Sequence, residues 1–346
     1  MHKFHSLIVS SIKPLTTDSV AISFDTTNND LFQFVSGQYI TIKHQIDGEE
    51  VRRAYSICSA ITEDLTIGVK RVENGKMSTF LTKDVKVGDA LEIMPPSGNF
   101  VVKSDPNHIV GICAGSGVTP IISILKTELA KDNSNKFTLI YGNQTQDSTM
   151  FSGQLKKLQE ENPTRLKIHW AYSREQVAGT IKGRIDKNTL QQLLTTFPSL
   201  KLAETYFICG PGEFIDNINE LLLLNKINQT KINFERFTSV EKKENTTDDT
   251  DEIVSNVTVS VDGEDFEFTL SNKGKTILDA AMEQGADVPF SCKGAVCCTC
   301  KAKVMKGKVT MDQNFSLSDE EVAEGYVLGC QSHPASENVV IDFDEM

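Results

Sequence analysis

The sequence predicts a multidomain protein with three folded parts: an antiparallel β-barrel, an α/β domain built on a parallel sheet, and a small α+β domain. Three observations predict this architecture. The chain has 346 residues, more than one hydrophobic core usually organises. Its first hundred or so residues alternate apolar and polar positions in short runs, and compact apolar strands then alternate with helical segments. A stretch rich in charged residues and Thr separates these two regions from a last segment, which holds five of the eight cysteines.

Residues 1–104 are expected to form the barrel. Runs such as YITIKHQI and LTIGVKRV alternate apolar and polar side chains, and Gly, Asn and Pro interrupt them. A period of two is typical of short antiparallel strands that bury one face. At His108 the pattern changes, because the apolar run HIVGICA is followed by a glycine turn and a helical segment. Similar strands recur at FTLIYGN, LKIHWAYS and TYFICGP, so residues 105–237 are expected to form a parallel sheet with helices on both faces.

The segment 238–255 is expected to be a flexible acidic linker, because it has no aromatic residue and cannot bury enough surface to offset the entropy of ordering. The formal net charge of the chain is −12, and residues 257–346 hold 16 acidic against 7 basic side chains. This balance argues against nucleic acid as a partner, since it leaves no basic surface for it. The acidity is either an ordinary solvated surface or a means of steering the protein toward a basic partner.

No run of 18 uninterrupted apolar residues occurs, and the first 25 residues contain only one short apolar patch. The sequence therefore predicts no membrane span and no signal peptide, and a soluble cytoplasmic protein is expected. A cytoplasmic chain does not usually keep structural disulfides. Cys58, Cys113 and Cys209 are expected to be buried apolar residues, and the cysteines near the C-terminus are expected to bind metal.

Four cysteines give the most specific signal. Cys292, Cys297 and Cys300 follow the spacing C-x4-C-x2-C, and Cys330 follows after 29 further residues. This spacing is typical of a plant-type 2Fe-2S cluster, with three thiolates from one tight loop and a fourth from a distant strand. Zinc is the main alternative, but zinc ribbons usually present two close pairs. Cys298 is expected to be a neighbour of the cluster and not a ligand.

The sequence around the cysteines agrees with this assignment. The segment VTVSVDGEDFEFTL predicts a hairpin, and TILDAAMEQGADVPFSCKG predicts a helix that runs into the cysteine loop. Residues 256–346 resemble a plant-type ferredoxin. The resemblance implies a β-grasp-like fold, a mixed sheet crossed by one helix.

Two motifs in the expected barrel suit a flavin. Arg53, Tyr55 and Ser56 offer a cation for a diphosphate, an aromatic face for a ring and a hydroxyl for a ring nitrogen. The segment GKMST, which begins at Gly75, places backbone amides and hydroxyls at a helix N-terminus, where phosphate groups bind well. Taken singly, each feature has an ordinary alternative as a surface charge, a sheet residue or a hairpin turn.

Three further segments suit a nicotinamide nucleotide. The segment GSGVTP follows a strand and opens a helix. Its glycines allow the backbone to approach a ligand closely, and the helix N-terminus attracts a diphosphate. Its Pro stands where the last glycine of the GxGxxG motif would stand. Cys209 begins the segment CGPG at the end of a later strand, where a plain strand-to-helix turn is the alternative. Ser173 and Arg174 suit a ribose 2′-phosphate, which favours NADPH over NADH, although an exposed loop arginine is the alternative.

In this order the motifs resemble the ferredoxin-NADP reductase superfamily. The resemblance implies FAD as the flavin, with Arg53 on its diphosphate, Tyr55 on its isoalloxazine ring and Ser56 near N5. It also implies that Cys209 lies beside the nicotinamide and that the segment FERF covers the flavin through Glu235 and Phe237, unless these two pack a seam between domains. The expected catalytic residues are Ser56, Cys209 and Glu235. The expected cofactor-binding residues are Arg53, Tyr55, Ser56, Lys76, Met77, Ser78, Gly115, Gly117, Thr119, Pro120, Ser173, Arg174, Cys209, Gly210, Pro211 and Phe237, and the expected metal ligands are Cys292, Cys297, Cys300 and Cys330.

A hydride carrier moves two electrons together, whereas a 2Fe-2S cluster accepts one, and a flavin between them makes the two compatible. An NAD(P)H-dependent oxidoreductase that passes single electrons to an outside acceptor is therefore expected, and the resemblance to reductases with a C-terminal ferredoxin domain implies an oxygenase component as that acceptor. The segments RAYSICS, GKMSTFL, YGNQT, YFICGPG and CKGAVCCTCKAKV resemble the reductase subunits of phenylacetyl-CoA epoxidase systems, which implies a di-iron epoxidase of phenylacetate catabolism as the acceptor. Two alternatives stay open: a ferredoxin-type reductase for another acceptor, such as a desaturase or a hybrid-cluster protein, and a flavin-free electron-carrier module.

Overall fold

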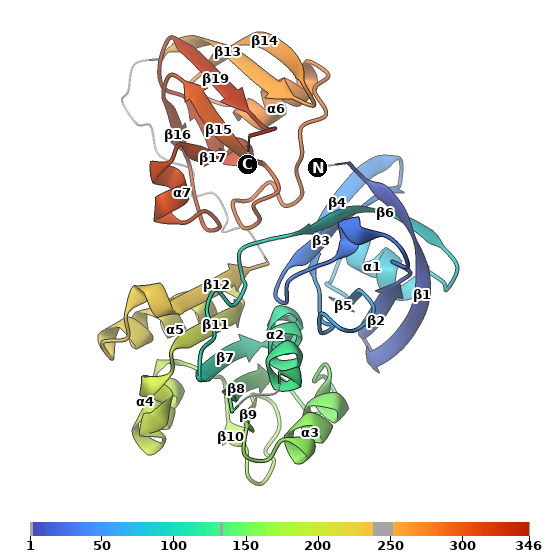
Figure 1. Ribbon diagram of the computed structural model, residues 1–346, viewed down its shortest axis with the longest axis vertical. Helices are drawn as coiled ribbons and strands as arrows, with labels where there is room; N and C mark the ends of the chain where they lie inside the picture. Colours follow the sequence, from blue (N-terminus) through green and yellow to red (C-terminus); the bar gives the residue numbers. More distant parts are fainter. Residues whose placement is uncertain (1–2, 132–133, 238–251, 346) are drawn as a thin grey trace. The chain divides into compact units, whose positions relative to one another are not determined.

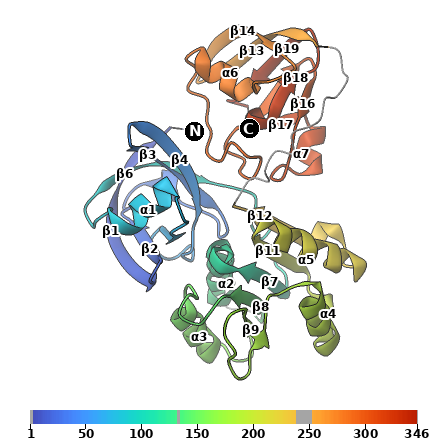
Figure 2. The ribbon, with the colours of Figure 1, turned by 180° about the vertical axis from the view of Figure 1, so that it is seen from behind.

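The computed structural model describes residues 3–131, 134–237 and 252–345. The chain divides into two compact units, residues 1–237 and residues 238–346, which we call the N-terminal unit and the C-terminal unit. Figures 1 and 2 show the elements of each unit from opposite sides. Within the described ranges, no helix is long and apolar enough to cross a membrane.

Six antiparallel strands form a barrel at the start of the N-terminal unit (Figure 1, blue to teal). In the order β4-β3-β6-β1-β2-β5, they are β4 (Glu49–Ser56), β3 (Tyr39–Ile46), β6 (Ala90–Ser97), β1 (His5–Thr16), β2 (Ser19–Phe24) and β5 (Thr66–Lys70). A bridge between Ile57, just after β4, and Ile67 of β5 joins the two edge strands. The sheet therefore closes on itself, and the predicted antiparallel barrel is confirmed.

Helical turns complete the barrel domain. They are η1 (Asp30–Phe32) and α1 (Lys76–Lys83). The helix α1 buries Met77 and Leu81 in the same core as Ile22 and Ile67 of the strands. The start of α1, and the backbone groups there, are thus held against the barrel.

The second half of the N-terminal unit is a six-stranded sheet in which every pair of neighbours is parallel. In the order β10-β9-β8-β7-β11-β12, the strands are β10 (Ile181–Lys182), β9 (Leu166–Tyr172), β8 (Lys136–Asn143), β7 (His108–Ala114), β11 (Thr205–Gly210) and β12 (Ile232–Arg236). The connecting helices are α2 (Val118–Ala130), α3 (Ser152–Glu161), α4 (Lys187–Thr196) and α5 (Gly212–Leu224), with the short turns η2 (Gly115–Gly117), η3 (Pro198–Leu202) and η4 (Gln229–Lys231). The predicted parallel sheet is confirmed.

Side chains of β7 alternate between the two faces of this sheet. Ile109 and Cys113 belong to the core under α2 and α3, whereas Val110 and Ile112 belong to the core under α4 and α5. The strands after β7 first extend the sheet through β8 to one side and later through β11 to the other. In open α/β sheets, ligands bind outside the carboxyl ends of the strands at such a switch point.

The barrel and the parallel sheet share a hydrophobic core. Phe100, which follows the last barrel strand, packs edge-on against Phe207 of β11 with ring centroids 5.0 Å apart. Ser123 of α2 donates a hydrogen bond of 2.6 Å to the carbonyl of Ser59. The two halves are therefore fixed relative to each other, and a boundary between them after residue 104 stays a prediction.

The C-terminal unit is built on a five-stranded mixed sheet (Figure 2, orange to red). In the order β14-β13-β19-β15-β17, its strands are β14 (Glu264–Ser271), β13 (Val254–Val261), β19 (Asn338–Asp342), β15 (Lys301–Lys306) and β17 (Tyr326–Leu328). A second pair joins β16 (Val309–Met311) to β18 (Ser332–Pro334), and the helical elements are α6 (Ile277–Glu283), α7 (Asp319–Ala323) and η5 (Gly329–Gln331). The pair β13 and β19 is parallel and the other pairs are antiparallel, so the expected mixed sheet is confirmed.

Two features of this unit differ from the sequence expectations. The helix α7 was not expected, although Ser318 and Glu321 form a capping box whose S-x-x-E spacing is visible in the sequence. The expected linker, residues 238–255, lies outside the described residues up to 251. Its last residues are not linker-like, because β13 begins at Val254 and Ser255 is fully buried.

Replacing Gly37 with Ala should destabilise the N-terminal unit more than replacing Gly48. Both glycines have left-handed backbone, with φ of 98° and 78°, so both new side chains meet similar backbone strain. A Cβ at residue 37 would lie 2.0 Å from the carbonyl oxygen of Phe100, whereas a Cβ at residue 48 meets nothing within 4 Å. Urea unfolding should show an extra loss of about 1–3 kcal/mol for Gly37→Ala. Equal losses for the two variants would contradict the close approach.

Candidate functional site

The carboxyl ends of the parallel strands bring the expected nucleotide residues to one edge of the sheet. Gly115 follows β7, Ser173 follows β9 and Gly210 ends β11. Because β7 and β11 are neighbours at the switch point, the turn after β7 and the turn after β11 lie at the edge where open α/β sheets bind a dinucleotide.

The glycine turn after β7 approaches β11 too closely for any other residue. A Cβ on Gly117 would lie 2.2 Å from the carbonyl oxygen of Cys209, and Gly115 has a left-handed φ of 57°. The side chains of Thr119 and Pro120 are buried, and the Thr119 hydroxyl donates to the carbonyl of Ser116 at 3.0 Å. These two side chains thus stabilise the turn, and the backbone amides at the start of α2 are the groups left for a diphosphate.

The three expected catalytic residues come together from the barrel and the sheet. Ser56, the last residue of β4, donates a hydrogen bond of 3.0 Å from Oγ to Oε2 of Glu235 on β12. Cys209 on β11 is the register partner of Glu235 across the parallel pair. Ser56 and Cys209 are buried and Glu235 is half-buried. The arrangement joins a hydroxyl, a thiol and a carboxyl at the switch point.

Desolvation keeps this group of side chains neutral. It raises the pKa of the Glu235 carboxyl to about 8, and it raises the pKa of the Cys209 thiol well above its usual value. At neutral pH the Ser56 and Glu235 pair therefore holds a proton that can be donated or recovered. A buried neutral thiol adds bulk beside it without adding charge.

On the barrel side, Arg53 and Tyr55 are two residues apart on β4 and so share one face of the strand. The guanidinium of Arg53 is exposed, and its Nη1 donates to the carbonyl of Arg52 at 2.7 Å. Tyr55 is half-buried against the barrel core, and desolvation raises the pKa of its hydroxyl. A cation and an aromatic ring on the same face fit the diphosphate and the ring system of a flavin.

The first turn of α1 presents backbone groups more than side chains. Lys76 pairs with Glu49, with 2.6 Å between Nζ and Oε2. Met77 is 2% exposed in the barrel core, and the Ser78 hydroxyl accepts from the amide of Val72 and donates to the carbonyl of Gly75. No side chain caps the N-terminus of this helix, so the backbone amides of its first turn can donate hydrogen bonds to phosphate oxygens.

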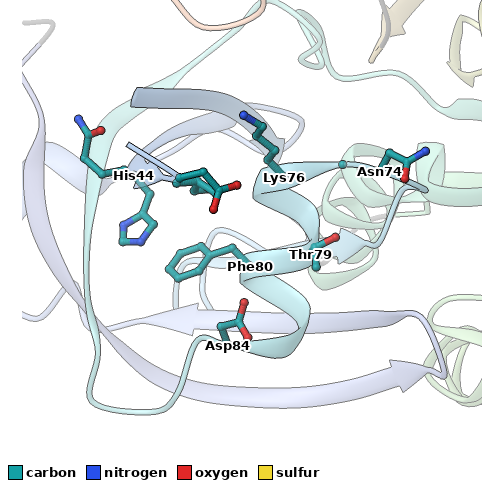
Figure 3. Close-up of a pocket in the computed structure, with 10 residues that line it drawn as sticks. His44, Asn74, Lys76, Thr79, Phe80 and Asp84 are labelled. Atoms are coloured by element: carbon teal, nitrogen blue, oxygen red, sulfur yellow. The ribbon is translucent and has the colours of Figure 1, made fainter. Parts of the chain in front are cut away.

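A cavity of about 440 Å³ lies beside this turn, between α1 and the hairpin of β3 and β4 (Figure 3). The rings of His44 and Phe80 stack in it with centroids 3.9 Å apart. Neither residue was predicted from the sequence. Phe80 stands four positions after Lys76, so helical spacing could have placed it on the same face of α1, but nothing in the sequence shows that β3 brings His44 there. The cavity leaves room beyond the phosphate groups for the second half of a dinucleotide such as FAD.

Two expected nucleotide residues and one expected flavin residue lie at the surface. Ser173 and Arg174 are exposed, and their backbone amides donate to the carbonyls of Asn143 and Gln144. Phe237 is 41% exposed directly after β12. These side chains therefore lie at the surface, just after the carboxyl ends of β9 and β12.

The four expected metal ligands form two thiol pairs. The Cys297 thiol donates to Sγ of Cys292 at 3.1 Å, and the Cys300 thiol donates to Cys330. Two pairs are the arrangement for a binuclear 2Fe-2S cluster, in which each iron takes two protein thiolates.

The backbone of the cysteine loop is shaped to face the sulfurs. Lys293 and Ala295 adopt left-handed φ values of 48° and 63°, and the amide of Gly294 lies 3.3 Å from Sγ of Cys292. The hydrogen bond from Cys297 lowers the pKa of Cys292 to about 6, and the one from Cys300 lowers the pKa of Cys330. Each pair thus has one thiol ready to ionise and bind iron.

Cys298, the remaining cysteine of the loop, has a backbone carbonyl as a hydrogen-bond partner. Its thiol donates to the carbonyl of Ser316 at 3.1 Å, and burial raises its pKa to about 11. Its contact is with the loop before α7. The surplus cysteine thus packs the cluster loop against the rest of the unit.

Three family models match the chain. They are an oxidoreductase FAD-binding domain over residues 6–102, an oxidoreductase NAD-binding domain over residues 112–220, and a 2Fe-2S iron-sulfur cluster binding domain over residues 259–335. The chain is 39% identical over 355 residues to one of the subunits of 1,2-phenylacetyl-CoA epoxidase of Escherichia coli strain K12, covering 99% of both chains. It is 31% identical over 350 residues to the ferredoxin reductase component of 3-ketosteroid-9-alpha-monooxygenase of Rhodococcus rhodochrous, covering 97% of this chain and 96% of the relative. The solved structure of phthalate dioxygenase reductase has the same fold, with a TM-score of 0.62, 24% identity and 98% of each chain covered.

Removing one member of the second thiol pair should remove the cluster. The Cys330→Ser variant is expected to lose most of its bound iron and sulfide, because one of the two irons would then have one protein thiolate in place of two. Cys298→Ala is the matched control, since the Cys298 thiol donates to the carbonyl of Ser316, and this variant should keep a full complement. Iron and sulfide analysis after anaerobic reconstitution measures both. Equal iron in the two variants would contradict the ligand assignment.

Glu235→Gln should change how stability depends on pH. The carboxyl has a pKa of about 8 in the folded protein against 4.5 as its ordinary value, so between these values the folded state holds one proton more than the unfolded state. The stability of the parent protein should therefore fall as the pH rises through this window. The unfolding temperature of Glu235→Gln minus that of the parent should therefore increase as the pH rises from about 5 to about 9. The same difference for the exposed control Glu160→Gln should show no such increase. A constant difference in unfolding temperature would contradict the raised pKa.

Proposed function

This chain belongs to the ferredoxin reductase superfamily, in the group whose members carry a C-terminal 2Fe-2S domain, and we propose that it delivers electrons from NAD(P)H to a di-iron oxygenase that epoxidises phenylacetyl-CoA. It is an NAD(P)H-dependent oxidoreductase with an FAD-binding domain and an NAD-binding domain. When bound, FAD supplies the conversion from two-electron to one-electron transfer, and the cluster supplies the one-electron exit.

One observation carries this proposal: a parallel sheet with a topological switch point and two thiol pairs occur in the same chain. The switch point is the place where an open α/β sheet binds a dinucleotide. The thiol pairs fit a cluster that carries one electron at a time. Neither part needs a nucleophile that attacks a substrate carbon, so the chemistry that we propose for this chain is electron transfer.

The residues at the switch point have assigned roles in this proposal. With FAD bound, the Ser56 hydroxyl and the Glu235 carboxyl would hold a proton at Oγ and Oε2 and would exchange it as electrons arrive and leave. Cys209, which is fully buried, fills the space next to them and excludes water from the path of the hydride. Arg53 and the free amides of α1 hold the diphosphate, and Tyr55 packs on the ring system.

The identity of the acceptor rests on the relatives. The Escherichia coli relative, named as a component of 1,2-phenylacetyl-CoA epoxidase, matches over 99% of both chains. The substrate itself would bind the oxygenase, not this chain. The acidic balance of residues 257–346 supports docking of the cluster domain on a basic face of that oxygenase.

A second candidate is a reductase for a different oxygenase. The relatives from Rhodococcus rhodochrous and Chromohalobacter salexigens are named as reductase parts of 3-ketosteroid-9-alpha-monooxygenase and glycine betaine monooxygenase. Their identities, 31% and 27%, are lower than the 39% of the epoxidase relative, which favours the epoxidase. The FAD-binding domain argues against the flavin-free carrier.

The exposed Arg174, which lies just after the carboxyl end of β9, supports NADPH as the preferred nucleotide. We also propose that the protein works in the cytoplasm, where both nucleotides and coenzyme A esters are found.

Coupled turnover tests the acceptor. In anaerobically prepared protein mixed with the purified epoxidase component and air, phenylacetyl-CoA should stimulate NADPH oxidation at least about tenfold, because the oxygenase draws electrons only when its substrate is bound. A purified 3-ketosteroid oxygenase with its own substrate is the matched control and should give little stimulation. Faster turnover with the control oxygenase would overturn the proposed acceptor while leaving the reductase activity intact.

A further inference from the structure

Gln331 directly follows the expected ligand Cys330, and its side chain is only 2% exposed. A buried side-chain amide is costly unless its polar atoms find partners. Three acceptors surround its Nε2: the carbonyl of Cys330 at 2.8 Å, Sγ of Cys330 at 3.6 Å and the carbonyl of Lys293 at 3.5 Å. Because all three accept hydrogen bonds, the nitrogen end of the amide must face them.

An amide nitrogen carries two N–H donors. The bond of 2.8 Å to the Cys330 carbonyl uses one of them. The second is directed at the region that contains Sγ of Cys330 and the Lys293 carbonyl, both at longer distances. A distance of 3.6 Å to a sulfur is within hydrogen-bonding range, because sulfur is larger than oxygen.

The same side chain connects the two parts of the chain that supply the cluster ligands. Lys293 belongs to the loop that holds Cys292, Cys297 and Cys300, whereas Gln331 belongs to η5 with the fourth cysteine. Lys293 has a left-handed φ of 48°, so its carbonyl is turned in a direction that ordinary backbone does not offer. Gln331 is therefore placed to hold Cys330 in position and to set the electrostatic environment of its sulfur.

A donor aimed at a ligand sulfur changes the reduction potential. Reduction adds one negative charge to the cluster and its sulfurs, so a hydrogen bond to a sulfur becomes stronger in the reduced state. Burial increases this difference, since no water screens the donor. Cys330 is itself 4% exposed.

We propose that Gln331 is a positioning residue that raises the reduction potential of the cluster by donating its side-chain N–H to Sγ of Cys330. This inference rests on the proposed 2Fe-2S cluster and goes beyond it, because it assigns the setting of the potential to a residue that is not a ligand. It makes electron entry from the flavin more favourable.

Gln331→Met tests the proposal, because Met has nearly the same length and volume but no donor. Ser332→Ala is the matched control: Ser332 is the next residue, is fully buried, and donates to the carbonyl of Leu328 at 2.8 Å and not to a ligand sulfur. The midpoint potential of the cluster in the full chain is measured by redox titration followed by electron paramagnetic resonance. Gln331→Met should lower the equilibrium constant for cluster reduction about tenfold, which is about 59 mV for one electron. Ser332→Ala should leave it unchanged.

A second variant keeps the test decisive if Gln331→Met does not hold a cluster. In Gln331→Glu a protonated carboxyl still donates to the sulfur and an ionised one does not, so the potential should fall between about pH 6 and about pH 9 more steeply than in the parent. A potential of Gln331→Met equal to that of Ser332→Ala, or a parent-like pH profile of Gln331→Glu, would overturn the role of Gln331. Absence of iron and sulfide from the parent protein would instead contradict the proposed function.

Discussion

The reductase half of the molecule depends on one hydrogen bond between two domains, from Ser56 at the end of a barrel strand to Glu235 on an edge strand of the parallel sheet. Both residues sit on strands, and the packing of Phe100 on Phe207 holds the barrel and the sheet in one shared core. A site divided between two loosely joined domains could not keep a flavin and a nicotinamide in contact, because an error of about 1 Å in such a geometry is already costly. The shared core is therefore a functional requirement as well as a source of stability.

The C-terminal unit meets a different constraint, which is to bring four sulfurs together without burying unpaired charge. Left-handed backbone at Lys293 and Ala295 turns the amides of the loop inward, and the thiols form two pairs across it. Buried thiolates next to backbone N–H groups are stabilised as anions, which is what iron requires. Gln331 extends the same principle from the backbone to a side chain.

The sequence predicted the fold classes and the cysteine set because both depend on short-range patterns: strand periodicity, the order of strands and helices, and the spacing C-x4-C-x2-C. It could not predict contacts that depend on long-range pairing. Ser56 and Glu235 are 179 residues apart, and only the resemblance to known reductases placed them in one site.

Local patterns also do not show what a side chain does. Met77 and Ser78 belong to the expected phosphate motif, yet Met77 fills the barrel core and Ser78 holds the preceding turn. These two residues therefore contribute their backbone groups to the motif. The stacked pair His44 and Phe80 and the amide of Gln331 were missed for the same reason, since each depends on which strand or loop lies opposite.

The central claim is that one polypeptide takes electrons in pairs and releases them singly. Anaerobic titration with NADPH, followed by visible absorption and electron paramagnetic resonance, tests it most directly. The account predicts that each chain accepts about three electrons, two in the flavin and one in the cluster, and that a reduced 2Fe-2S signal appears as the flavin absorption bleaches. A chain that accepts only two electrons, with bleaching but no signal from a reduced cluster, would contradict it.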